Sequence, residues 1–133
     1  MKKLLSLLLV ICLVGCTHTQ QITEKNSSVG TCRLTITAGE TSLLDSDVTI
    51  LEGDTVLSIL RRTANANELP IMLSGQGAQA YVIGIAEYTA GAKGSMSGWV
   101  YEINESPVFT AAGDTSVKNE DRVHWKYITE FTQ

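Results

Sequence analysis

Two short segments alternate between hydrophobic and polar residues, which is the pattern of half-buried β-strands. They cover residues 33–37 and 47–51, and both are rich in β-branched side chains. The sequence Ala38-Gly39-Glu40 interrupts the first alternation before the second begins. We therefore predict a β-hairpin near the start of the folded part of the chain.

A helical spacing follows this hairpin. Asp54 is placed to cap the first backbone N–H groups of a helix, and Pro70 lies shortly after its expected end. The pattern predicts a helix over residues 55–66. Its buried face should carry Val56, Ile59, Leu60 and Thr63.

Three further strands are predicted over residues 81–86, 99–103 and 122–128. The last alternates most clearly, so one face should pack on the helix and the other should face water. A strand pair, one helix and then more strands is the order of a β-grasp fold, in which a mixed sheet packs on one helix. We predict the α+β class. In the last strand the inner residues are Val123, Trp125 and Tyr127, and the outer ones are Arg122, His124 and Lys126.

The N-terminus carries the pattern of an exported lipoprotein. Lys2 and Lys3 precede an apolar run over residues 4–14, which is shorter than the roughly 20 residues that span a bilayer. The run ends in Leu13-Val14-Gly15-Cys16, which resembles the lipobox of bacterial lipoprotein precursors. In that motif, cleavage precedes a cysteine that carries diacylglycerol. The alternative is an ordinary cleaved signal peptide.

This interpretation divides the chain into a signal peptide (1–15), a lipidated flexible tether (16–30) and a folded domain (31–133). The membrane is then a predicted partner through the lipid on Cys16. Thr17, next to that cysteine, is typical of an outer-membrane destination if the host has two membranes. Otherwise the lipid places the protein on the outer face of the cell membrane.

The charge balance argues against a nucleic-acid partner. Ten Lys and Arg residues stand against fourteen Asp and Glu, which gives a formal net charge of -4. Proteins that bind nucleic acid need a basic surface to neutralise phosphates. We therefore expect no nucleic-acid partner.

Five segments together resemble the domain of unknown function 4430, a family similar to the C-terminal β-grasp domain of transcobalamin and intrinsic factor. They read EGDTVL, YVIGI, GWVYEIN, AGD and VHWKY, and they lie within residues 52–127. The resemblance implies a domain that covers one face of a corrinoid, and we expect no counterpart here of the helical domain that holds the other face. Two turns depart from the family pattern: Asn104-Glu105 stands for Asn-Gly, and Asn119-Glu120-Asp121 for Asp-Gly-Asp.

No catalytic motif is visible. The sequence contains no HExxH, no CxxC and no glycine-rich phosphate loop, and its two histidines are His18 and His124. The acidic pairs Asp45/Asp47 and Glu120/Asp121 lie in turn-like segments, where solvated charge is the ordinary explanation. We predict that the protein is not an enzyme and has neither catalytic residues nor a metal site.

Cys32 is expected to be a core residue. Cys12 leaves with the predicted signal peptide and Cys16 carries the lipid, so Cys32 has no partner for an internal disulfide. It shares one strand face with Leu34 and Ile36, and free cysteine is commonly a small buried hydrophobe. A reactive thiol with a redox role is the alternative.

The aromatic residues suggest where a ligand would bind. All eight lie in residues 81–131, and two glycine-containing loops, 74–80 and 91–98, precede strands that begin with Tyr81 and Trp99. Rings at these positions can stack on a planar ligand while nearby glutamines fix its orientation, although both rings also fit a core role. The candidate ligand-binding residues are Gln76, Gln79, Tyr81, Ser97, Trp99 and Tyr101.

We therefore expect a lipid-anchored binding protein that captures a small molecule for an uptake system or a partner lipoprotein. Cobalamin or another corrinoid is the candidate ligand, and the anchoring lipid is the one covalently attached group expected. The alternative is a non-catalytic envelope module whose ligand is another protein or the cell-wall polymer.

Overall fold

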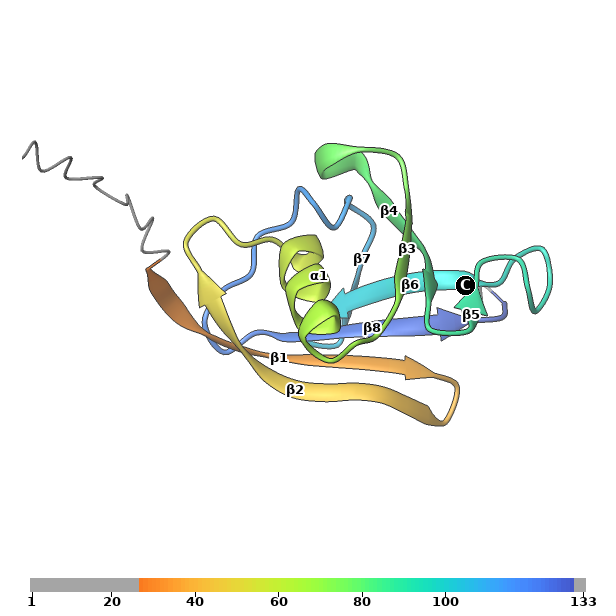
Figure 1. The fold of residues 1–133 in the computed structure, drawn as a ribbon, viewed down its shortest axis with the longest axis horizontal. Helices are drawn as coiled ribbons and strands as arrows, with labels where there is room; N and C mark the ends of the chain where they lie inside the picture. The colour runs from red at the N-terminus through yellow and green to blue at the C-terminus, as the bar shows by residue number, and fades with distance from the viewer. Residues whose placement is uncertain (1–26, 131–133) are drawn as a thin grey trace, which may run out of the picture.

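A five-stranded mixed sheet forms the base of the fold in the computed structural model, which describes residues 27–130. The strand order is β2-β1-β8-β6-β7, and β1 and β8 run parallel at the centre while the other pairs are antiparallel. Figure 1 shows one helix lying across one face of this sheet. Its strands are β1 (Ser28–Ala38), β2 (Thr41–Leu51), β6 (Gly98–Ile103), β7 (Ser106–Val108) and β8 (Arg122–Ile128).

A smaller antiparallel sheet packs on the same face as the helix (Figure 1). It has the order β3-β4-β5, with β3 over Ile71–Ser74, β4 over Tyr81–Ile85 and β5 over Tyr88–Thr89. A short 3-10 helix, η1 (Gly77–Gln79), lies between β3 and β4. β3, β5 and β7 were not predicted from the sequence, because each has four residues or fewer and too little alternation to stand out.

The helix α1 (Val56–Ala66) begins with a capping box formed by residues other than the predicted Asp54. Thr55 is the N-cap: its hydroxyl accepts the N–H of Ser58 at 3.2 Å, and the Ser58 hydroxyl accepts the N–H of Thr55 at 2.8 Å. Asp54 lies one position too early to cap. Its carboxylate instead accepts the N–H of Leu51 at 2.8 Å and an ion pair from Arg62 at 2.7 Å, which ties the end of β2 to the helix.

The predicted α+β fold with one helix on a mixed sheet is confirmed, and so are the inner faces of the helix and of β8. Burial alternates along β8 as predicted, with Trp125 3% exposed and Tyr127 7%. β1 begins at Ser28, inside the segment predicted as tether, because its first residues already pair with the end of β2. The helical face that enters the core contains Val56, Ile59, Leu60 and Thr63.

Cys32 is buried in the core, on the face of β1 that also carries Leu34 and Ile36. Burial, together with nearby carboxylates such as Asp121, raises the pKa of its thiol to about 11. A thiol with so high a pKa is protonated at neutral pH and is a poor nucleophile. This environment agrees with the core interpretation of Cys32.

Candidate functional site

A cleft of about 570 Å³ opens beside the first half of β6. β7 pairs with β6 only from Tyr101 to Ile103, so residues 98–100 have no strand on that side within the part of the chain described. The segment after β7 leaves the sheet there and forms one wall, while β4 forms another. The lining residues are Tyr81, Val82, Trp99, Val100, Tyr101, Glu102, Pro107, Val108, Phe109, Thr110, Ala111, Ala112, Trp125, Lys126, Ile128 and Glu130.

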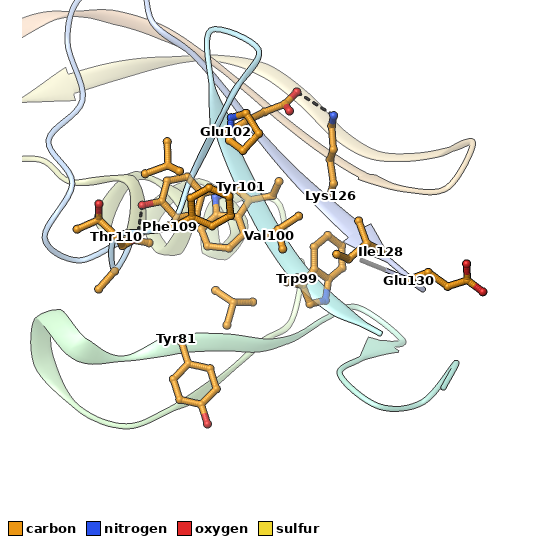
Figure 2. Close-up of a pocket in the computed structure, with 16 residues that line it drawn as sticks. Tyr81, Trp99, Val100, Tyr101, Glu102, Phe109, Thr110, Lys126, Ile128 and Glu130 are labelled. Carbon is orange, nitrogen blue, oxygen red and sulfur yellow. Dashed lines mark hydrogen bonds and ion pairs between the residues drawn. The ribbon is translucent and has the colours of Figure 1, made fainter. Parts of the chain in front are cut away.

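Hydrogen bonds join the wall formed by residues 109–112 to β6 and to α1. The Tyr101 hydroxyl donates to the carbonyl of Thr110 at 2.5 Å, a bond drawn in Figure 2, and it also lies 2.8 Å from the Thr115 hydroxyl. The N–H of Leu57, in the first turn of α1, donates to the carbonyl of Ala112 at 3.0 Å. Burial raises the pKa of the Tyr101 phenol. The hydroxyl contacts of Tyr101 therefore fix the position of this wall relative to β6.

Paired aromatic rings form the floor of the cleft. Tyr101 and Trp125 lie side by side on neighbouring strands, with ring centroids 5.0 Å apart. Trp99 packs on Tyr127 at 5.4 Å, and its indole N–H donates to the carbonyl of Tyr88 at 2.9 Å. Such contacts hold the rings in fixed orientations, so little ordering is needed when a ligand arrives.

Two further rings stand exposed at the rim. Tyr81, at the start of β4, is 60% exposed, and Phe109 is 95% exposed. Both residues line the cleft, with Phe109 in the segment after β7 and Tyr81 on β4 (Figure 2). An almost fully exposed phenylalanine at the edge of a concave, mainly apolar surface is available for contact with another molecule.

The outer rim of the cleft carries an ion pair. Lys126 Nζ lies 2.9 Å from Glu102 Oε1, and His124 Nδ1 lies 3.4 Å from the same oxygen. These side chains lie on the sheet face away from α1, as the alternation of β8 predicted for His124 and Lys126. The pair adds polar groups at the edge of a surface that is otherwise mainly aromatic and aliphatic.

The lining of the cleft is mainly aromatic and aliphatic, with a few polar groups. Within residues 27–130, no group of three or more His, Cys, Asp and Glu side chains is placed to hold a metal ion. In the same residues, no helix is long and apolar enough to cross a bilayer. An aromatic cleft with a few polar groups is the usual form of a small-molecule site.

Comparison with known families gives a clear assignment. Residues 53–129 match the model of the family described as "Domain of unknown function (DUF4430)", which is more than half of the chain. The chain belongs to this family. No curated protein sequence matches it.

Solved structures support the fold of the DUF4430 domain. Haptocorrin in complex with Cbi matches with a TM-score of 0.66 and 16% identity over 77% of this chain, which spans only 25% of the haptocorrin chain. A candidate metal-binding protein from Ruminococcus gnavus ATCC 29149 matches with a TM-score of 0.54 and 14% identity, covering 77% of this chain and 99% of its own. At these identities the similarity establishes the fold alone.

The structure brings together three of the six predicted ligand-binding residues of the DUF4430 domain. Tyr81, Trp99 and Tyr101 all line the cleft, although Tyr101 is 7% exposed and its hydroxyl is bonded within the protein. Whether these residues bind a ligand stays a prediction.

The other three predicted residues do not line the cleft. Ser97 is buried, and its hydroxyl donates to the carbonyl of Gly94 at 2.8 Å, so it fixes its own loop. Gln79 Nε2 donates to an oxygen of Asp114 at 2.5 Å, and this bond joins η1 to the loop after β7. Gln76 is exposed just before η1.

Sequence reasoning missed the segment 107–112 as a wall of the site and assigned Trp125 to the core alone. An isolated aromatic residue in a polar loop, Phe109, was the available signal. Gly113 supports this wall, because a Cβ at its position would come within 2.5 Å of the carbonyl oxygen of Ala78. The close approach of these two loops needs a glycine there.

Proposed function

We propose that this protein is a lipid-anchored, non-catalytic binding protein that holds a corrinoid, or another planar small molecule of similar size, in the cleft beside β6. The observation that carries the proposal is the combination of a fixed aromatic floor with two exposed rings at the rim. Planar ligands gain most from such surfaces, because stacking and apolar burial act over the same area.

The fold similarity supports the choice of ligand class. The haptocorrin structure contains Cbi, a cobalamin precursor, and this chain corresponds to about a quarter of that protein. A single cleft that is open to solvent covers one face of a ligand. We therefore propose that a partner, such as an uptake protein, covers the other face of the ligand in the cell.

The lipid anchor belongs to the proposal on sequence grounds. Leu13-Val14-Gly15-Cys16 lies outside the described residues, and the motif with its preceding apolar run supports acylation of Cys16. Two acyl chains on one cysteine give stable membrane attachment, since each buried CH₂ contributes about 0.8 kcal/mol. The protein would then act at the outer surface of a membrane.

Titration of the purified chain in detergent with cobalamin, and separately with cobinamide, tests the function. Saturable binding, followed by calorimetry and by the visible absorption of the corrinoid, is the expected result. Absence of saturable binding of both compounds would refute the corrinoid assignment. The exposed Tyr81 and Phe109 would then favour the alternative, a protein partner in the envelope.

A further inference from the structure

Trp125 lies at the centre of the sheet and also forms part of the floor of the cleft. It lies in the middle of β8, with Ile36 of β1 as its neighbour on one side and Tyr101 of β6 on the other. Its side chain is 3% exposed, and it is one of the residues that line the cleft. Its ring is therefore held in place by the most central strands of the fold.

The indole nitrogen of Trp125 has no hydrogen-bond partner. Among the buried side-chain nitrogen and oxygen atoms of residues 27–130, it is the one left unpaired. An indole N–H can only donate, and burial removes the water that would otherwise accept from it. Buried polar groups without partners are rare in native proteins and call for a specific explanation.

The neighbouring polar aromatic groups show that the fold can satisfy such donors. Trp99 donates its indole N–H to the Tyr88 carbonyl at 2.9 Å, and Tyr127 donates its hydroxyl to the Thr89 carbonyl at 2.7 Å. Tyr101 donates to Thr110. Trp125 lines the same cleft as Trp99 and Tyr101, and it differs from all three of these residues in having no acceptor.

We propose that the Trp125 indole N–H is a ligand-binding donor that selects molecules carrying a hydrogen-bond acceptor, such as an amide, carboxylate or phosphate oxygen. This inference rests on the proposed function, and it narrows the ligand class to planar molecules with polar substituents. Purely hydrocarbon ligands would leave the donor unpaired and so bind less well. Because the nitrogen is covered in this structure, the complex includes a small shift of the indole or of the side chains in front of it.

The two tryptophans of the chain make a direct spectroscopic test possible. The chain is labelled with ¹⁵N-tryptophan, and its two indole signals are assigned with the Trp125→Phe variant. Trp99 serves as the internal comparison: it also lines the cleft, but its N–H is already bonded to the Tyr88 carbonyl. On saturation with cobinamide or cobalamin, the Trp125 indole signal should shift and its hydrogen exchange should slow by about 10-fold, and exchange at the Trp99 indole should slow less.

The Trp125→Phe variant supplies a second readout. It keeps an aromatic ring but removes the donor, so binding should weaken by about 5- to 10-fold, the usual effect of one neutral hydrogen bond. Its fold is checked by circular dichroism. If it does not fold, the Trp99→Phe variant assigns the two indole signals instead, and the exchange measurement on the parent chain still tests the inference.

The outcomes separate this inference from the proposed function. Saturable corrinoid binding without a change in Trp125 exchange overturns the inference and leaves the function standing. A folded Trp125→Phe variant that binds the corrinoid with the same affinity as the parent also overturns the inference and leaves the function standing. Absence of corrinoid binding overturns both the inference and the corrinoid assignment of the proposed function.

Discussion

Truncating Phe109 to alanine should weaken ligand binding without changing stability. The ring is 95% exposed, so its removal takes almost no buried contact from the folded protein. A planar ligand that covers one face of the ring would bury about 100 Å² of apolar surface, which corresponds to about 2.5 kcal/mol. Ordering the side chain costs about 0.5–1 kcal/mol, and the remaining 1.5–2 kcal/mol predicts a dissociation constant about 10- to 30-fold higher.

The assay compares corrinoid titrations of the parent, of Phe109→Ala and of Met72→Ala. Met72 is a matched control because it is also a large exposed hydrophobic residue, 52% exposed on β3, and it does not line the cleft. Its replacement should leave both binding and stability unchanged. If Phe109→Ala binds like the parent, the ligand does not contact this ring and the proposed position of the site is wrong. A large loss of stability in Phe109→Ala would instead show that the ring is packed.

Four further predictions test the fold and the anchor. Leu60 is fully buried, so Leu60→Ala should lower the free energy of unfolding by about 2–5 kcal/mol in denaturant titrations, whereas the exposed neighbour Arg61→Ala should change it by less than about 0.5 kcal/mol. The pKa of Asp54 is lowered from its ordinary 3.8, since burial alone would raise it but the hydrogen bonds from Arg62, Leu51 and Ser58 outweigh that effect. Its stabilising contribution is therefore present above pH 3.8 and lost as the pH falls through the lower folded value, and Asp54→Asn should make unfolding less pH-dependent there. Glu105 has a φ of 69°, which disfavours a side chain, so Glu105→Gly should stabilise the protein by about 0.5–1 kcal/mol, seen as a higher melting temperature. Cys16→Ser should move the protein out of the membrane fraction and abolish labelling by a lipid probe; retained label would contradict acylation at this cysteine.

The elements with strong periodicity could be predicted from the sequence. Arg122–Ile128 alternates over its whole length, and its bounds agree with β8, because a strand in the middle of a half-solvated sheet must place every second residue in the core. The helix was also found, since four residues of one face define it. Its cap was assigned one residue too early because Asp54 and Thr55 are both good N-cap residues, and the tertiary ion pair with Arg62 decides between them.

The cleft could be predicted only in part, because it depends on where two strands separate. The short pairing of β7 with β6 ends at Val108, and the segment that follows is held by the bond from Tyr101 to Thr110. These contacts join residues that no local pattern connects. Gln79 lies outside the cleft for the same reason, since its side chain bonds Asp114 where two loops that are distant in sequence meet.

The two turns that depart from the family pattern place residues other than glycine in the left-handed region. Asn104 and Glu105 have φ values of 51° and 69°, and Glu120 has 69°, so all three adopt the left-handed region without glycine. Side-chain bonds offset part of the cost: Asn104 Oδ1 accepts the N–H of Arg122 at 2.9 Å. The departures therefore change local stability and leave the fold intact.

The place of β8 at the centre of the sheet governs the order in which the protein can fold. β8 is the last strand of the described chain, yet it pairs with β1 on one side and β6 on the other. Before β8 is synthesised, the hairpin β1–β2 and the hairpin β6–β7 are two separate units, because β8 is the strand that joins them in the sheet. Pairs such as Arg33 with Arg122 close a very long loop, which is slow in folding terms. During synthesis the five-stranded sheet therefore cannot be completed until β8 has emerged from the ribosome.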